Sequence, residues 1–148
     1  MNYHKCFWDS GIMSEIPIFK RGSFNGIRKF FDENGNLERI CGYINTNING
    51  FNKWYNRNGY ISSCSFYING KIEGTSIAFT GACLIMKEYS FRNDIAKGMM
   101  REYHDNGILK EESLWLNNDQ IGAKISYRDD GRVVLREINL NNINISQR

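Results

Sequence analysis

The amino-acid sequence predicts an all-β protein, an elongated single antiparallel meander sheet built from tandem β-hairpins. Three observations lead to this prediction. Glycine recurs every 24 residues, aromatic side chains recur at two fixed offsets from it, and Asn-Gly or Asp-Gly dipeptides separate short β-prone runs. A helical alternative fails because glycine and other turn formers interrupt every stretch long enough for a helix.

Each repeat begins at a glycine that is followed at fixed distances by an aromatic, a second glycine, a second aromatic and an Asn. The first glycines are Gly26, Gly50, Gly74, Gly98 and Gly122. The first aromatics are Phe31, Tyr55, Phe79, Tyr103 and Tyr127, and the second aromatics are Tyr43, Tyr67, Phe91 and Trp115. The Asn column contains Asn45, Asn69, Asn93 and Asn117. Counting backward finds a degenerate N-terminal copy with Phe7, Gly11 and Phe19.

Six copies of the repeat account for nearly the whole chain. Hydrophobic residues make up 41% and aromatic residues 14% of the 148 residues, which is enough to bury a core. We therefore expect one domain, residues 1–148, with repeats at about 2–25, 26–49, 50–73, 74–97, 98–121 and 122–145.

The length of the first turn decides which face of the sheet each aromatic column occupies. Asn34-Gly35 and Asp130-Gly131 are typical of that turn, and Asn69-Gly70 of the second one. A two-residue turn would place the two aromatic columns on opposite faces. A three-residue loop with a left-handed glycine would place them on one face, where a continuous aromatic ladder buries more apolar surface. We expect the three-residue loop and the shared face.

Two places depart from the pattern. In the fourth repeat, Thr80-Gly81-Ala82-Cys83 places glycine two residues early, which predicts a hairpin with a distorted turn. In the last repeat, Asn139 stands where an aromatic is expected and is followed by Asn141, Asn142 and Asn144. This predicts a polar cap that ends the ladder and protects the edge strand.

The segment from Phe66 to Gly74, Phe-Tyr-Ile-Asn-Gly-Lys-Ile-Glu-Gly, resembles the core of a MORN repeat, and the spacing of Gly50, Tyr55 and Gly59 is similar to the bacterial MORN variant. That variant is common in YwqK-type antitoxins. The resemblance covers nearly all of the chain. It implies consecutive antiparallel hairpins, roles in protein or lipid binding, and toxin neutralisation.

Composition and charge exclude several classes of function. The net charge of +3 is too balanced to indicate a nucleic-acid partner. No apolar run approaches the ~18 residues of a membrane span, and the N-terminus does not resemble a signal peptide, so we expect a cytoplasmic protein. Without an export signal, the four cysteines are expected to be small buried apolar residues, although they could form two disulfides.

No catalytic residue, metal site or cofactor site is expected. The cysteines form no C-x-x-C pair, and His4 lies far from His104 in the sequence. Glu111 and Glu112 are neighbours on a strand and so point to opposite faces, which excludes a carboxylate dyad between them. His104 precedes a turn, where a structural role is expected. The chain is therefore expected not to be an enzyme.

Three features are candidates for binding. A basic column, Lys5, Lys29, Lys53 and Arg101, could meet an acidic partner, or its stems could cover neighbouring rings while the charges stay in water. The N-terminal half is apolar on both faces, which predicts an interface unless the sheet curls over itself or self-associates. The irregular turn at Gly81 and Cys83 is the third, although drift in a tolerant loop also explains it.

These features predict a partner-binding site formed by Phe30, Trp54 and Phe66 as aromatic anchors, with Arg28, Lys29 and Lys53 around them. The leading hypothesis is a bacterial antitoxin, immunity protein or similar inhibitor that neutralises another protein by steric binding. One alternative is a module that binds phospholipid at a membrane surface. Another is a scaffold that self-associates through the N-terminal apolar face.

Overall fold

The computed structural model describes residues 6–17 and 25–139 of the chain. The chain forms two compact units, residues 1–73 (unit 1) and 74–148 (unit 2). Their boundary falls where the third predicted repeat ends and the fourth begins. Within the described ranges no helix is long and apolar enough to cross a membrane.

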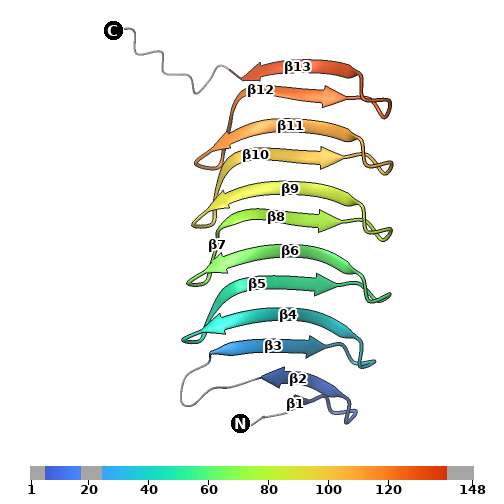
Figure 1. Cartoon of the computed structure of the whole chain (residues 1–148), viewed down its shortest axis with the longest axis vertical. Coiled ribbons are helices and arrows are strands. Elements are labelled where there is room, and N and C mark those ends of the chain that lie inside the picture. The colour runs from blue at the N-terminus through green and yellow to red at the C-terminus, as the bar shows by residue number, and fades with distance from the viewer. Residues whose placement is uncertain (1–5, 18–24, 140–148) are drawn as a thin grey trace. The chain divides into compact units, whose positions relative to one another are not determined.

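Both units are antiparallel meanders, so the predicted all-β hairpin architecture is confirmed (Figure 1). In unit 1, each strand pairs with the next along the chain, and the short β7 pairs with β6. Its strands are β1 (Cys6–Phe7), β2 (Met13–Pro17), β3 (Gly26–Phe31), β4 (Leu37–Ile44), β5 (Asn47–Tyr55), β6 (Ile61–Ile68) and β7 (Lys71–Ile72). Unit 2 contains β8 (Gly74–Phe79), β9 (Ile85–Arg92), β10 (Ile95–Tyr103), β11 (Leu109–Leu116), β12 (Asp119–Tyr127) and β13 (Val133–Asn139).

The predicted three-residue loop is confirmed at the first turn of each described hairpin. In the β10–β11 hairpin, the backbone N–H of Gly107 donates to the carbonyl of His104, and the N–H of His104 donates to the carbonyl of Ile108, both at 2.8 Å. Gly107 has a φ of 82°, the left-handed conformation that glycine adopts without steric penalty. The same pair of hydrogen bonds recurs at Gly11, Gly35, Gly59 and Gly131.

The fourth repeat keeps this loop without its glycine, so the expected distortion is wrong. Cys83 takes the glycine position with a φ of 64°, and its N–H donates to the carbonyl of Thr80 at 3.0 Å. The position also explains why Cys83 is exposed rather than buried as expected. All four cysteines are free, and among them only Cys41 is buried.

Each second turn that the structure describes is a two-residue loop in which both residues have positive φ. The pairs are Asn45-Thr46, Asn69-Gly70, Asn93-Asp94 and Asn117-Asn118, with φ values between 49° and 82°. This is the turn whose twist matches that of the flanking strands, and Asn tolerates its left-handed first position better than most residues. The Asn column of the sequence is therefore a turn requirement.

The two aromatic columns lie on opposite faces, so the expected shared face is wrong. One strand of each hairpin carries an extra residue beyond the loop: Tyr103 lies opposite Leu109, but Glu102 lies opposite Glu111. The additional bulge at Lys110 reverses the face assignment that the three-residue loop alone would give. The equivalent extra residues are Glu38, Ser62, Met86 and Val134.

We call the two sides of each unit the first-column face, which carries Phe31, Tyr55, Phe79, Tyr103 and Tyr127, and the second-column face, which carries Tyr43, Tyr67, Phe91 and Trp115. On the second-column face, each aromatic lies directly opposite a repeat glycine, as Trp115 does opposite Gly98. A Cβ at Gly98 would approach the Cβ of Ser90 to 2.9 Å, so this crowded position needs glycine. The first glycine column and the second aromatic column are thus cross-strand partners.

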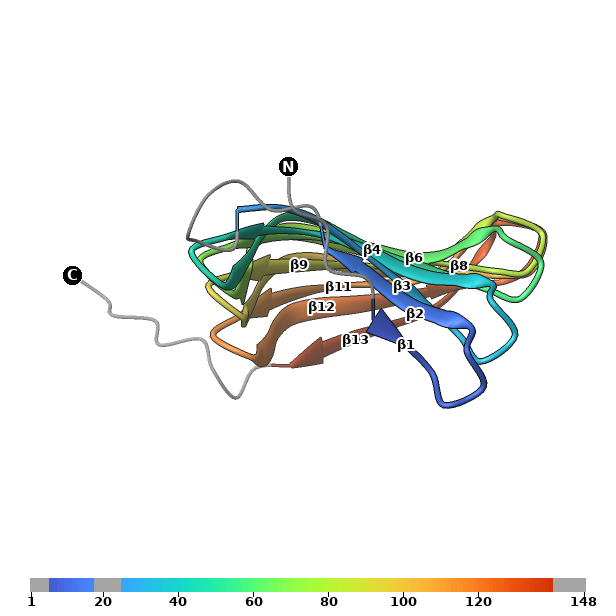
Figure 2. The ribbon, with the colours of Figure 1, turned by 90° about the horizontal axis from the view of Figure 1, so that it is seen from below.

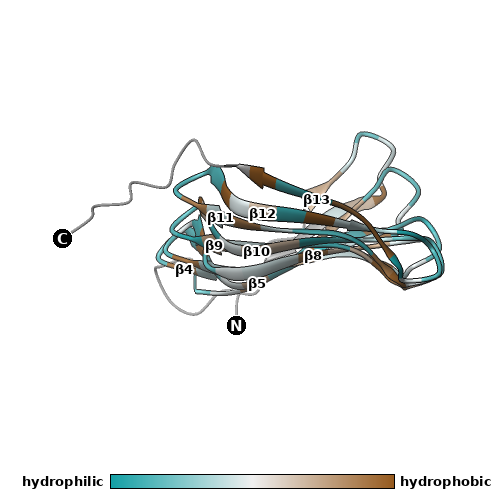
Figure 3. Ribbon diagram, turned by 90° about the horizontal axis from the view of Figure 1, so that it is seen from above, coloured by the Kyte–Doolittle hydropathy of each residue, from teal (hydrophilic) through white to brown (hydrophobic). Residues whose placement is uncertain are grey.

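Each unit is a single sheet layer, so few side chains are fully buried. Among the described residues only Cys41 is completely buried, and Ala96, Asn52 and Ser113 are 5–6% exposed. The strands curve along their length (Figure 2), and the turns at their ends are hydrophilic (Figure 3). The rings of the aromatic columns are mostly half-buried. The polar cap predicted at Asn141, Asn142 and Asn144 lies outside the described residues.

Replacing Cys83 by Gly is expected to stabilise the protein by about 0.5 to 1 kcal/mol. The left-handed conformation costs a non-glycine residue about 1–2 kcal/mol, of which the greater backbone entropy of unfolded glycine cancels about 0.5–1 kcal/mol. Urea unfolding measures the change. The matched control is Gly107→Ala, at a position with open space around a Cβ, which should destabilise by a similar amount. A destabilised Cys83→Gly would contradict the strain at this turn.

Candidate functional site

The six residues predicted to bind a partner are divided between the two faces of unit 1. Arg28, Phe30 and Trp54 lie on the second-column face, where Arg39 is directly opposite both Phe30 and Trp54. Lys29, Lys53 and Phe66 lie on the first-column face. The six therefore do not form one surface, because the extra bulge residue moves Phe66 to the side opposite Trp54.

The second-column face of unit 1 holds a stack of arginines and rings. The guanidinium carbon of Arg39 lies 4.8 Å from the Trp54 ring centroid and 5.5 Å from that of Phe30. The guanidinium carbon of Arg28, two residues before Phe30 on β3, lies 5.7 Å from the Phe30 ring centroid and 5.2 Å from that of Tyr43. Contacts of this kind stabilise by about 0.5–2 kcal/mol each, so the stack holds both arginines in place.

A buried amide orients the arginine at the centre of this stack. Asn52 is 5% exposed, and its Oδ1 accepts a hydrogen bond of 2.7 Å from Nε of Arg39. Beside it, burial raises the pKa of the Tyr43 hydroxyl, with a smaller contribution from the Cys41 thiol. Sequence analysis missed Arg39, because only the strand register shows that it lies between Phe30 and Trp54.

The first-column face of unit 1 carries a line of four side chains that we call the lysine row: Lys29, Ile40, Lys53 and Cys64. Each lies directly opposite the next on a neighbouring strand. The Nζ of Lys53 lies 5.4 Å from the Phe51 ring centroid. Neither lysine forms an ion pair with a described carboxylate, including the nearby Glu38.

Exposed apolar side chains flank the lysine row on the side of the two-residue turns. Their exposed fractions are 39% for Ile27, 49% for Ile44, 49% for Phe66 and 47% for Ile68. Cross-strand pairing places Phe66 opposite Phe51, two residues along from Lys53 and Cys64. Unit 1 therefore combines two cations with a group of exposed apolar side chains on one face, a composition typical of interfaces.

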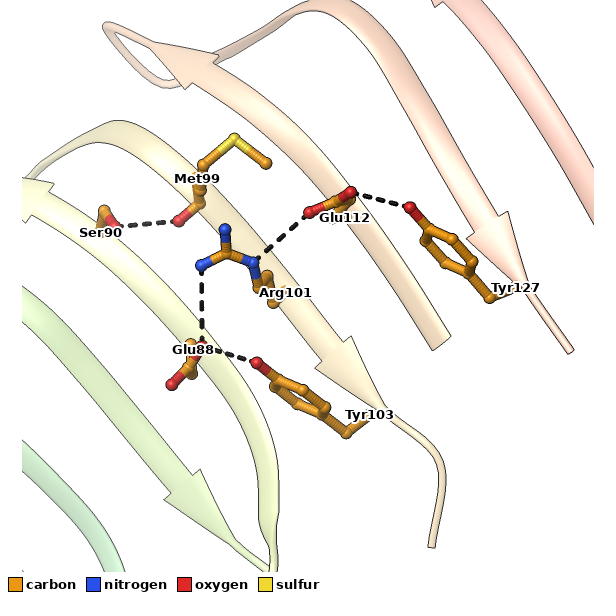
Figure 4. A network of polar contacts seen from close by, with 7 residues as sticks. All are labelled: Glu88, Ser90, Met99, Arg101, Tyr103, Glu112 and Tyr127. Atoms are coloured by element: carbon orange, nitrogen blue, oxygen red, sulfur yellow. Dashed lines mark hydrogen bonds and ion pairs between the residues drawn. The ribbon is translucent and has the colours of Figure 1, made fainter. Parts of the chain in front are cut away.

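In unit 2 the corresponding row places one cation, Arg101, between the carboxylates of Glu88 and Glu112 (Figure 4). Nη1 of Arg101 lies 3.9 Å from Glu88 Oε2, and its Nε lies 3.4 Å from Glu112 Oε2. The hydroxyls of Tyr103 and Tyr127 donate to Glu88 and Glu112, both at 2.8 Å. Burial, and then the bond to Glu88, raise the pKa of Tyr103, while the bond to Glu112 is the main cause of the raised pKa of Tyr127.

The second-column face of unit 2 pairs its cations too. Nζ of Lys87 lies 2.7 Å from Glu102 Oε1, which also accepts a 3.0 Å hydrogen bond from the Tyr89 hydroxyl. On the same face, Nζ of Lys124 lies 2.9 Å from Oε2 of Glu111. The hydrogen bond from Lys87 is the main cause that lowers the pKa of Glu102, and the same bond raises the pKa of Lys87.

The two units therefore differ in carboxylates at equivalent repeat positions. The carboxylates that pair with Lys87, Arg101 and Lys124 in unit 2 belong to Glu88, Glu102, Glu111 and Glu112. The side chains at the equivalent repeat positions of unit 1 are Ile40, Trp54, Ser63 and Cys64. Residues 1–73 contain nine Lys and Arg against six Asp and Glu, whereas residues 74–148 contain ten of each. The whole net charge of +3 thus belongs to unit 1.

The groups considered for catalysis have structural partners. His104 Nε2 donates to the carbonyl of Tyr127 at 2.9 Å, as Nε1 of Trp8 does to Phe31 at the same repeat position. This confirms the expected turn-associated role of His104. Glu111 and Glu112 point to opposite faces, as predicted. No cluster of three His, Cys, Asp or Glu side chains suited to a metal occurs among residues 6–17 and 25–139.

Lys87→Gln removes the ion pair between Lys87 and Glu102. We expect it to lower the free energy of unfolding by less than about 1 kcal/mol at neutral pH, because both side chains are about one-third exposed. The pKa of Glu102 is lowered below its ordinary 4.5. The pair therefore stabilises the fold above that pH, and its contribution is lost as the pH falls through the lowered pKa.

The difference between wild type and Lys87→Gln should accordingly shrink below pH 4.5. Urea unfolding across this pH range measures it. Lys97→Gln is the control, because Lys97 is exposed and forms no ion pair in the described structure. If the difference in the free energy of unfolding stayed constant down to low pH, Lys87 would not be what lowers the pKa of Glu102.

A comparison with known protein families agrees with the predicted repeats. The MORN repeat variant family matches residues 24–45 and 97–117. No curated protein matches the chain in sequence. Two similar solved structures are TarM (12% identity, TM-score 0.44, 70% of this chain) and a mutant of S. aureus TarM with Fondaparinux, alpha-GlcNAc-glycerol and UDP (12%, 0.45, 65%). The chain spans about a fifth of their length. The two matched segments fall in the second and the fifth predicted repeats.

Proposed function

We propose that this chain is a non-catalytic repeat protein that binds another protein through unit 1. The observation that carries the proposal is the group of exposed apolar side chains around Phe66, beside Lys29 and Lys53, which have no carboxylate partner among the described residues. MORN repeats are in general protein- or membrane-binding modules, which agrees with this function. The specific form that we propose is a bacterial, cytoplasmic antitoxin or immunity-type inhibitor that blocks its target sterically.

Leaving this apolar surface in water costs free energy that a partner could recover by covering it. Burying apolar area contributes about 25 cal/mol per Å², and a half-exposed aromatic ring therefore provides a substantial gain when a partner covers it. Aromatic and arginine side chains dominate binding energy in protein interfaces. In unit 1, Trp54 and Arg39 provide such a pair on one face and Phe66 provides the ring on the other.

The polar side chains of unit 2 support a structural role for that half. Arg101, Glu88 and Glu112 satisfy one another, and the two tyrosine hydroxyls complete the network. A group held in this way is unsuited to act as a nucleophile or base, since its lone pairs and protons are already engaged. We therefore assign binding to unit 1 and propose no catalytic activity.

The experiment is capture of partners from the native host by the tagged protein, followed by affinity measurement for any protein bound in stoichiometric amount. Phe66→Ala should weaken that complex by about thirtyfold, the effect of losing about 2 kcal/mol at an interface hot spot. Leu114→Ala is the matched control, because Leu114 occupies the same repeat position in unit 2 and is similarly exposed.

Trp54→Ala tests the second-column face in the same measurement. Loss of the partner with this variant alone would assign binding to the arginine stack. Loss with Leu114→Ala but with neither unit 1 variant would contradict the assignment to unit 1. A protein that captures nothing and elutes as a dimer or larger species would instead favour the self-associating scaffold.

A membrane-surface module is the second candidate, favoured by the same combination of lysines with exposed Ile27 and Ile68. Sedimentation with phosphatidylglycerol vesicles at low salt tests it. Binding that disappears in Lys29→Gln/Lys53→Gln would support this function, and absence of binding at low salt would remove it.

A further inference from the structure

We propose that the lysine row of unit 1 is a docking site for an acidic segment of a partner protein. The partner's carboxylates would lie over Ile40 and Cys64, where Glu88 and Glu112 stand in unit 2. This inference deepens the proposed function and rests on it, because it names the chemistry of the partner and selects the first-column face.

The lysine row of unit 1 and the row around Arg101 in unit 2 occupy equivalent repeat positions. Ile40, Lys53 and Cys64 occupy the same repeat positions as Glu88, Arg101 and Glu112. In unit 2, a carboxylate on each neighbouring strand approaches the central cation, at 3.9 and 3.4 Å. Unit 2 thus shows what the row looks like when its cation is neutralised on both sides.

Unit 1 keeps the cations of this row and lacks the carboxylates. A carboxylate placed over Ile40 would lie between Lys29 and Lys53, which are two strands apart and so about 10 Å from each other. A second one over Cys64 would approach Lys53 from the other side. Both lysines are half-buried, which limits screening by salt and strengthens attraction to an incoming anion.

The lysine row has an apolar border. Ile27, Phe51 and Phe66 follow the row on the side of the two-residue turns. A partner segment that fits must therefore present carboxylates in one line and apolar side chains beside them. The cation–ring contact between Lys53 and Phe51 brings the charged and apolar parts into one continuous surface.

An acidic protein fits this surface better than an anionic membrane does. Electrostatic anchoring to lipid uses clusters of about four to eight Lys or Arg side chains, each contributing about as much as the next. The lysine row holds two, Lys29 and Lys53. Two cations on either side of Ile40 match two or three carboxylates fixed on a protein, rather than a membrane surface.

The test uses a dye-labelled synthetic peptide in which Glu and Leu alternate, with fluorescence anisotropy as the readout. The full-length protein should bind it, and binding should weaken as salt rises. Lys29→Gln/Lys53→Gln should weaken binding by about tenfold or more. The matched control, Lys97→Gln/Lys110→Gln, removes the same charge from exposed unit 2 lysines that form no ion pair with any described residue. It should change peptide binding by less than about twofold.

Ile40→Glu is the second variant, since it introduces the unit 2 carboxylate and neutralises the row from within. It too should weaken peptide binding by about tenfold or more. Circular dichroism reports whether this variant folds. If it does not, the lysine double variant still decides, because its substitutions change charge with little loss of buried apolar surface.

Several outcomes would overturn the proposal. One is a peptide that does not bind, or that binds the lysine double variant as it binds wild type. Another is that polyphosphate binds as tightly as the peptide does and that the same variants abolish this binding, which would show that the row recognises phosphate. A third is binding to phosphatidylglycerol vesicles, lost in those variants, by a protein that ignores the peptide.

Failure of this inference and failure of the proposed function give different results. A captured host protein that the lysine double variant still binds would retain the function and reject the acidic docking site. Peptide binding lost in the double variant, from a protein that captures no host protein, would retain the site chemistry and reject the function.

Discussion

The backbone geometry of the hairpin loop determines on which face each candidate binding side chain of this protein lies. A left-handed residue in the third loop position closes the turn, and an extra residue three positions farther along shifts the register. Together they place the two aromatic columns on opposite faces. Each face of a unit therefore has its own line of rings, and the side chains between those rings are presented on a regular lattice of strand positions.

A lattice of this kind allows the two units to use equivalent positions for different purposes. In unit 2 the positions between the aromatic columns carry Glu88, Glu102, Glu111 and Glu112, which pair with Arg101, Lys87 and Lys124. In unit 1 the cations remain, and neutral side chains stand in place of the carboxylates. Exposed ion pairs add little to stability, so the difference matters more for the surface charge than for the fold.

The cations of unit 1 have different neighbours on its two faces. On the second-column face, the rings of Phe30 and Trp54 and the amide of Asn52 hold Arg39. On the first-column face, Lys53 lies over Phe51 and Lys29 has no described partner. The first-column face therefore keeps the more accessible positive charge, together with most of the exposed apolar side chains of the unit.

The sequence by itself determined the class of fold, the repeat length and both turns. This was so because glycine and Asn at left-handed positions respond to local backbone sterics, which the sequence shows directly. The aromatic and basic residues around Lys29 and Trp54 also led to the hypothesis that the N-terminal half binds a partner.

Only the tertiary structure decided which residues share a face. The bulge residues Glu38, Ser62, Met86, Lys110 and Val134 have no common chemistry, so nothing in the sequence marks the register shift. One shift reverses the side of every later residue on the strand, because side chains alternate between faces. For that reason Phe66 was grouped with Trp54, and Arg39, which contacts Phe30 and Trp54 across strands, was missed.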